Sequence, residues 1–217
     1  MSLQFINTDA LITAPLQQTP YPYVVIPQFL KQDVVSTLVE NFPHIVHRGS
    51  IPADSVLSHK IFQDFTQELM GQVLQQLIAQ KFSLDLKDKP TMLTLRGNTT
   101  DRDGAIHTDS KSKLITLLLY MNPTWNTPEG QLRILSNKKS LKNYAAEISP
   151  LAGSCVIFQV TRHCWHGHTP FNGKRLSLQL NYLRNDAALN KHLNHHRFTA
   201  WLKKYLPKFF HQNQETY

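Results

Sequence analysis

Residues 163–182 read HCWHGHTPFNGKRLSLQLNY, a histidine-rich turn that leads into a stretch of alternating polar and apolar residues. A two-residue period predicts a strand, because successive side chains of a strand point to opposite faces. One face is mainly leucine, and the other carries Arg175, Ser177, Gln179 and Asn181. The apolar face needs a core to pack against, whereas a polar face of this length lines a ligand cavity in a closed barrel. The stretch therefore predicts a β-rich fold built around a polar cavity.

A second short motif, Ile106-His107-Thr108-Asp109, lies upstream and also precedes a strand. Together with one histidine of the turn, His107 and Asp109 provide two imidazoles and one carboxylate. This set of ligands is typical of a redox-active iron with open coordination positions. Arg175 could then pair with the carboxylate of a co-substrate. The candidates for the third iron ligand are His163, His166 and His168.

The composition is that of a globular protein. The 217 residues are 41% hydrophobic and 18% charged, which suffices for one sizeable core, and we predict a single domain over residues 1–217. No run of about 18 apolar residues occurs, and the N-terminus lacks the features of a secretory signal. Two cysteines, Cys155 and Cys164, are too few for a disulfide framework, so we expect a reduced, cytoplasmic protein.

The formal net charge is +8, and part of it lies in a basic C-terminal segment. Such a segment can attract nucleic acid or an anionic surface, but a solvated face is the simpler explanation. No nucleic-acid-binding motif accompanies the charge, so nucleic acid is disfavoured as a partner. A small-molecule or peptide substrate is expected instead.

Helical periodicity precedes the strands along the chain. Apolar spacing predicts a helix near 31–42 and one long helix over about 56–80. Residues 1–20 show little periodicity and are expected to be an arm or a poorly ordered lead-in. Two-residue alternation and flanking turn residues predict strands at 21–27, 91–98, 113–121, 129–135, 153–158 and 174–182.

The order of these elements favours an α+β fold over an alternating α/β fold. We predict a helical N-terminal part (about 28–82), an antiparallel sandwich or barrel (about 90–183) and a helical C-terminal extension (about 186–217). Residues 136–150 are expected to form a polar loop that could act as a lid.

These motifs resemble those of the 2-oxoglutarate/Fe(II)-dependent dioxygenases, and in particular their prolyl 4-hydroxylase-like branch. The resemblance spans roughly 92–183. It implies a double-stranded β-helix, or jelly roll, with Fe(II), 2-oxoglutarate and O2 as cofactors and ascorbate as a candidate reductant. The implied reaction hydroxylates a substrate and releases succinate and CO2. The residues that carry the resemblance are His107-Thr-Asp109, Leu117–Asn122, Gly130, His166–Pro170 and Arg175.

The resemblance also implies roles for individual residues. Arg175 would bind the far carboxylate of 2-oxoglutarate, helped by Tyr120 and by Thr116 on the same strand face. The family's spacing between the last iron ligand and this arginine favours His166 over the two neighbouring histidines. The implied iron ligands are therefore His107, Asp109 and His166.

The substrate is less well defined. The strand before the iron motif often carries a tyrosine in prolyl hydroxylases, but here it reads Thr94-Leu-Arg-Gly-Asn98, which weakens any transfer of prolyl specificity. Arg96 could contact the substrate or pair with a nearby carboxylate. A protein side chain, an amino acid, a sugar or another small molecule would suit a polar cavity. The candidate substrate contacts are Arg96, Asn98, Trp125, His168 and Asn181.

Three other functions stay open on the sequence alone. A nucleic-acid demethylase of the same superfamily fits the basic charge. In that branch, however, the co-substrate arginine lies further past the last histidine and another arginine follows, whereas here Arg175 comes nine residues after His166 and no second arginine follows within the strand. A zinc hydrolase could use the same His/Asp/His set with a bound water, but it does not explain Arg175 on the cavity face. A non-catalytic jelly roll that binds a ligand or a partner would not need intact metal ligands.

Overall fold

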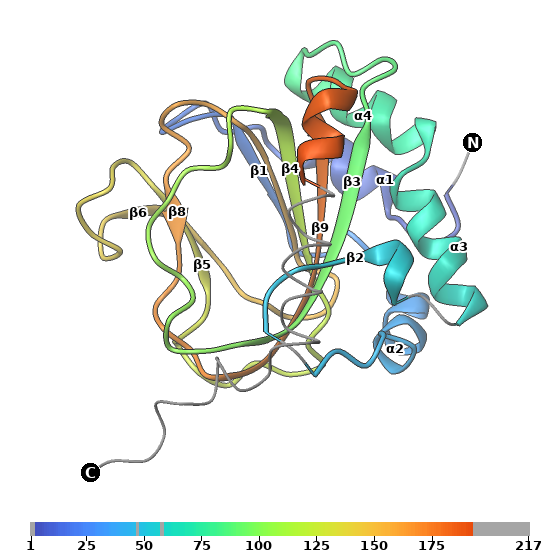
Figure 1. The fold of residues 1–217 in the computed structure, drawn as a ribbon, viewed down its shortest axis with the longest axis horizontal. Helices are drawn as coiled ribbons and strands as arrows, with labels where there is room; N and C mark the ends of the chain where they lie inside the picture. Colours follow the sequence, from blue (N-terminus) through green and yellow to red (C-terminus); the bar gives the residue numbers. More distant parts are fainter. Residues whose placement is uncertain (1–2, 47, 57–58, 193–217) are drawn as a thin grey trace.

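The computed structural model of the chain, which describes residues 3–46, 48–56 and 59–192, contains two antiparallel sheets. In their order across the larger sheet, the strands are β1 (Tyr23–Ile26), β7 (Cys155–Gln159), β4 (Lys113–Tyr120), β9 (Gly173–Leu183), β3 (Thr91–Thr99) and β2 (Ile51–Pro52). The strands of the smaller sheet, again in order, are β6 (Tyr144–Ile148), β5 (Leu132–Leu135) and β8 (His166–Gly167). Figure 1 shows the smaller sheet on one side of the larger sheet and the helices on the other.

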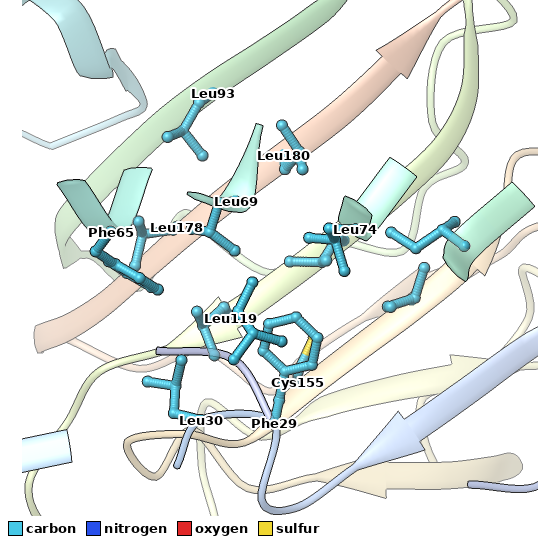
Figure 2. Close-up of a cluster of buried hydrophobic side chains, with 14 of the residues drawn as sticks. Phe29, Leu30, Phe65, Leu69, Leu74, Leu93, Leu119, Cys155, Leu178 and Leu180 are labelled. Atoms are coloured by element: carbon cyan, nitrogen blue, oxygen red, sulfur yellow. The ribbon is translucent and has the colours of Figure 1, made fainter. Parts of the chain in front are cut away.

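The helices supply the core for one face of the larger sheet. They are α1 (Thr8–Thr13), α2 (Gln32–Glu40), α3 (Lys60–Leu69) and α4 (Gln72–Phe82), with a short 3-10 helix η1 (Ala53–Ser55). Phe65, Leu69 and Leu74 from α3 and α4 belong to the same buried cluster as Leu178 and Leu180 of β9 (Figure 2). These leucines are the apolar face predicted for the strand at 174–182, so the polar face of β9 is left for the cavity.

The first twenty residues are better ordered than their pattern suggests. Phe5, Ile6 and Leu11 are buried in the main core. The backbone amides of Phe5 and Ile6 donate to one carboxylate oxygen of Glu68 on α3, at 2.8 and 2.9 Å. The expectation of an arm or poorly ordered lead-in is therefore wrong for residues 3–20, because the stabilising contacts come from a distant helix and leave no local periodicity.

The single helix expected over 56–80 is also wrong, since α3 and α4 are separate helices. α3 ends at Leu69, and Gly71 has an extended backbone (φ −75°, ψ 159°) that precedes α4. A Cβ atom at residue 71 would lie 3.1 Å from the carbonyl oxygen of Glu68, so glycine suits this tight link. A four-residue apolar repeat continues through the link, and periodicity alone does not reveal it. The side chains buried on either side of the link are Phe65, Leu69, Leu74 and Ile78.

Six of the strands, β1, β3, β4, β5, β7 and β9, lie within or close to the ranges that alternation predicts. β2, β6 and β8 are not predicted. β6 occupies part of the stretch at 136–150, so the expectation of a loop is wrong for residues 144–148. The polar character of β6 has a physical cause, because it is an edge strand and Arg133 of β5 pairs with its Glu147 at 2.6 Å.

Some predictions fall on residues outside the described part of the chain. Residues 186–192 are helical, but the remainder of the predicted C-terminal extension, 193–217, lies outside the described residues. The same holds for Leu57 at the start of the long helix that was expected. Within the described ranges, no helix has both the length and the apolar character needed to cross a membrane.

Candidate active site

The two halves of the predicted metal motif meet where β8 runs beside residue 107. His107 and His166 form an antiparallel bridge, in which each backbone amide donates to the other's carbonyl oxygen at 3.0 Å. Their imidazole centroids lie 4.3 Å apart. Asp109 follows two residues later, and one ligand atom from each of the three side chains lies within 4.8 Å of the others. The structure therefore brings together three side chains that could hold a metal ion.

Backbone carbonyls fix the orientation of both imidazoles. The Nδ1 atom of His107 lies 2.9 Å from the carbonyl oxygen of Ala105, and that of His166 lies 2.8 Å from the carbonyl oxygen of Cys164. Because a carbonyl only accepts, each Nδ1 carries the proton and each Nε2 keeps a lone pair for a ligand. Metal-binding histidines are commonly held in this way. Burial lowers the pKa of His166 to about 4, which keeps the imidazole neutral and able to bind a metal.

Asp109 is held at both carboxylate oxygens. Its Oδ1 atom lies 3.1 Å from Nζ of Lys113, and its Oδ2 atom accepts a hydrogen bond from the hydroxyl of Thr116. Burial by itself raises the pKa of this carboxyl group. The Lys113 ammonium, the nearby His166 and the Thr116 hydrogen bond outweigh burial, so the net pKa lies below its usual value. An ionised carboxylate beside two imidazoles fits Fe(II) as a donor set.

Two residues near Asp109 differ from the sequence expectation. Thr116 is expected to assist at the co-substrate carboxylate, but its hydroxyl lies between Asp109 and the side-chain oxygen of Asn181, which is 3.1 Å away. Lys113 is not predicted as a site residue, since it opens an apolar strand. Its spacing of four residues from Asp109 is the kind of signal that could have identified it.

Another part of the cavity holds a buried guanidinium. Arg175 is 5% exposed, and its Nε atom donates to the carbonyl oxygen of Gly130 at 2.7 Å. Its Nη2 atom donates to the hydroxyl of Tyr120 at 3.2 Å. A guanidinium has five N–H donors, so these contacts orient the group and leave donors for a ligand. Tyr120 lies four residues along β4 from Thr116, which places this pair at the opposite end of the cavity from Asp109.

Two of the predicted substrate contacts, Arg96 and His168, line the same cavity. An Nη1 atom of Arg96 lies 3.3 Å from Oδ1 of Asp103, so this arginine both pairs with a carboxylate and faces the cavity. The Nδ1 atom of His168 donates to the carbonyl oxygen of Thr169 at 2.8 Å, which leaves Nε2 as an acceptor. Burial, with a smaller contribution from nearby Arg175, lowers the pKa of His168 to about 4 and keeps it neutral.

The other three predicted substrate contacts are absent from the described residues that line the cavity. A bulge in β3 turns Asn98 toward the backbone carbonyl oxygen of Ile45, 2.8 Å away. Trp125 lies against Phe171, with ring centroids 4.6 Å apart. Asn181 is fully buried. The side-chain oxygen of Asn181 lies 3.1 Å from the hydroxyl of Thr116 and 3.2 Å from Nε2 of Gln179.

The cavity wall beside His168 requires a glycine. Gly104 has a φ of +96°, and a Cβ atom there would lie 2.4 Å from the carbonyl oxygen of His168. The backbone amide of His168 donates to the carbonyl oxygen of Gly104 at 2.9 Å, so the two segments are in close contact. A glycine just before the metal motif is a visible signal for such an approach, but the residue that approaches it cannot be identified from the sequence.

Known proteins resemble this chain in sequence and in fold. Residues 97–183 match the model of the 2OG-Fe(II) oxygenase superfamily. No curated protein matches the sequence. A prolyl-4-hydroxylase from Pseudomonas putida has a similar structure, with a TM-score of 0.54 and 19% identity over 82% of this chain and 90% of that chain.

Two further structures share the fold. A prolyl 4-hydroxylase from Phytophthora capsici has a TM-score of 0.57 and 17% identity, over 84% of this chain and 67% of that chain. A viral collagen prolyl hydroxylase from Paramecium Bursaria Chlorella virus-1, solved as a 2-oxoglutarate complex, has a TM-score of 0.50 and 14% identity, over 75% and 96% of the two chains. Residues 97–183 are therefore similar to the 2OG-Fe(II) oxygenase superfamily, enzymes that use Fe(II), 2-oxoglutarate and O2, and the fold of the chain is similar to that of prolyl 4-hydroxylases.

Proposed function

We propose that this protein hydroxylates a C–H bond of its substrate and converts 2-oxoglutarate and O2 to succinate and CO2. In this proposal Fe(II) is held by His107, Asp109 and His166. The observation that carries it is the convergence of these three side chains, with ligand atoms within 4.8 Å of one another, on a cavity that also contains the buried Arg175. A zinc hydrolase would use the same ligands but would leave this arginine without a role.

We further propose that the two antiparallel sheets are those of a double-stranded β-helix, and that the chain is one catalytic domain. The support is that residues of both sheets line one cavity, with Thr116 and Tyr120 from the larger sheet and Leu132 and His166 from the smaller. A cavity enclosed in this way suits a ligand-binding jelly roll.

The residues of the site have separate tasks in this proposal. Bound Fe(II) and 2-oxoglutarate would supply the oxidising power needed to attack a C–H bond. Arg175 would donate to the far carboxylate of 2-oxoglutarate. Tyr120 orients its guanidinium through the hydrogen bond at 3.2 Å. The hydrogen bond from Thr116 to Asp109 holds the carboxylate in place before a metal binds. The chain thus fixes both the metal ligands and the position of the co-substrate.

Substitution of the two histidines tests the ligand assignment. His107→Ala and His166→Ala should each abolish uncoupled turnover, which is the slow formation of succinate from 2-oxoglutarate in the absence of the substrate that is hydroxylated. His163→Ala is the matched control, because His163 is exposed and lies in the same turn as His166. Turnover of 2-oxoglutarate at the wild-type rate in both ligand variants would show that the assignment is wrong.

For the substrate, we propose that an anionic group binds Arg96. Among the described residues the guanidinium of Arg96 makes one hydrogen bond, at 3.3 Å to Asp103, although it has five donors. Arg96 lines the cavity together with Arg175, which concentrates positive charge there. The Nε2 acceptor of His168 suits a hydrogen-bond donor on the same molecule. An acidic amino acid or an acidic peptide would provide both groups.

Pools of N-acetylated amino-acid amides, divided into acidic, neutral and basic side chains, test this substrate class. The acidic pool should raise succinate release above the uncoupled rate in the wild type. Arg96→Gln should lose this stimulation and keep the uncoupled rate. Stimulation by the neutral or basic pools alone, or no response to the acidic pool, would contradict the assignment of Arg96.

A further inference from the structure

A buried lysine lies directly against the metal motif. Lys113 is 7% exposed, and its Nζ atom lies 3.1 Å from Oδ1 of Asp109. Lysine is rarely buried, because an ammonium group is costly to remove from water unless it is paired. A buried lysine at this position therefore calls for an explanation beyond the packing of β4.

The backbone of β4 turns Lys113 toward Asp109, which lines the cavity. Thr116 and Tyr120 line the cavity. Because side chains alternate along a strand, residue 113 should lie on the opposite face, beside the buried Ile115 of the core. The contact between Lys113 and the carboxylate of Asp109 shows that this alternation does not continue to the start of the strand.

A β-bulge is the cause of this reversal. The register between β4 and β9 shifts between Lys113 and Ile115, and Leu114 is the extra residue because the partners of its two neighbours are consecutive in β9. The extra residue places Lys113 on the same face as Thr116. Bulges near active sites commonly re-aim a side chain in this way. The distortion delivers a positive charge to the carboxylate.

We infer that Lys113 is a positioning residue that holds Asp109 for iron and favours Fe(II) over Fe(III) at this site. The inference rests on the proposed function, since it requires iron on Asp109. With Lys113 at one oxygen and Thr116 at the other, the carboxylate is fixed in orientation and each oxygen keeps lone-pair capacity for a metal.

The electrostatic reason is that a fixed cation repels a trivalent ion more strongly than a divalent ion at the same place. Loss of one electron from Fe(II) to O2 is therefore less favourable beside the Lys113 ammonium. For groups a few ångströms apart in a partly buried site, one unit of charge should change the ratio of Fe(III) to Fe(II) affinity by about tenfold or more. Lys113 thereby protects the resting centre from oxidation.

Three variants separate the charge of Lys113 from its other contacts. Lys113→Gln keeps a hydrogen-bond donor without the charge, and Lys113→Arg keeps the charge. Lys111→Gln is the matched control, because Lys111 is exposed and its replacement changes the net charge of the protein equally. The measurement is the midpoint potential of the Fe(III)/Fe(II) couple in an anaerobic redox titration, followed by the ferric electron paramagnetic resonance signal.

Lys113→Gln should move the midpoint potential downward, by a shift equivalent to about a tenfold change in affinity ratio, while Lys113→Arg and Lys111→Gln stay near the wild type. An equal potential in Lys113→Gln and Lys111→Gln would overturn the inference. Lys113→Met gives a second neutral variant, and loss of folding in both neutral variants by circular dichroism would also overturn it, because Lys113 would then serve the fold. Failure of the wild type to bind Fe(II) would instead refute the proposed function.

Discussion

The two ends of the cavity are built differently. At the anchoring end, Arg175 and Tyr120 are 5% and 0% exposed. At the metal end, His166 is equally buried, but His107 is exposed to solvent. Packing therefore fixes the side chains of the anchoring end without a ligand, whereas the metal end is open to solvent on the side of His107. This division suits a co-substrate anchored deep in the protein and a reaction that takes place near the mouth.

The charges follow the same division. Among the described residues Arg175 forms no ion pair, whereas Asp109 pairs with Lys113 at 3.1 Å. An unpaired buried guanidinium is costly, so an anionic ligand would relieve that cost. The carboxylate of the metal end already has its counter-charge. Arg175 thus forms an ion pair within the described residues only if an anionic ligand binds, whereas Lys113 compensates the charge of Asp109 before a metal binds.

The largest effect is expected at the metal end. Asp109→Ala removes the anionic ligand and should weaken Fe(II) binding by more than about 100-fold, whereas Thr116→Val removes only a hydrogen bond to that ligand and should cost about tenfold. Fe(II) affinity measured anaerobically by competition with a chromogenic chelator checks both values. Similar affinities in the wild type and Asp109→Ala would remove Asp109 from the ligand set.

The next effect concerns the anchor. Arg175→Met removes the partner of the co-substrate carboxylate and should weaken 2-oxoglutarate binding by about 2–5 kcal/mol, which is roughly 30-fold or more. Binding of Fe(II) alone should be unchanged, because Arg175 does not contact the metal ligands. Calorimetric titration of the protein with 2-oxoglutarate, with Mn(II) in place of Fe(II), measures the affinity for the co-substrate. A loss of Mn(II) binding in Arg175→Met would mean that the two ends of the cavity are not independent.

A pH effect on the metal-free protein should be smaller. His166 and His168 have a pKa of about 4 in the folded chain against 6.5 for an ordinary histidine. Between these values the unfolded chain binds more protons, so these two histidines should make the free energy of unfolding fall as the pH drops from 6.5 toward 4. Urea unfolding across this range, with His168→Gln as a variant of shallower slope, checks the sign. A free energy of unfolding that rises on acidification would be inconsistent with buried neutral imidazoles.

The smallest effect is expected for Tyr120→Phe. It removes one hydrogen bond to Arg175 and keeps the ring that packs beside the guanidinium. A single hydrogen bond contributes about 1 kcal/mol, so the affinity for 2-oxoglutarate should fall by about fivefold. The same calorimetric titration detects this change. A loss as large as that of Arg175→Met would mean that the tyrosine hydroxyl, and not the guanidinium, is the main anchor.

The residues of the candidate site could be predicted from the sequence because they belong to local patterns. Alternation along 113–121 and 174–182 predicts the two central strands and the polar face that carries Arg175. The short motif at His107 and the histidine turn each precede a regular strand, so a common site could be inferred without knowing the fold. The structure brings these segments together at the bridge between His107 and His166.

What could not be predicted depends on distant partners or on single-residue irregularities. Order at the N-terminus comes from Glu68, which lies more than sixty residues away from Phe5. The break at Gly71 interrupts an apolar repeat that continues on both sides. The bulge at Leu114 reverses the face of Lys113, although strict alternation would send that side chain into the core. Periodicity reports on average geometry, and these features are departures from it.

The most direct measurement is an anaerobic absorption titration with Fe(II) followed by 2-oxoglutarate. A co-substrate that chelates iron through its keto acid end should produce a metal-to-ligand charge-transfer band in the visible region, and the band should be absent in His166→Ala. We expect this band only when both components are present. A wild-type protein that binds Fe(II) without developing the band, or a His166→Ala variant that retains it, would contradict the proposed site.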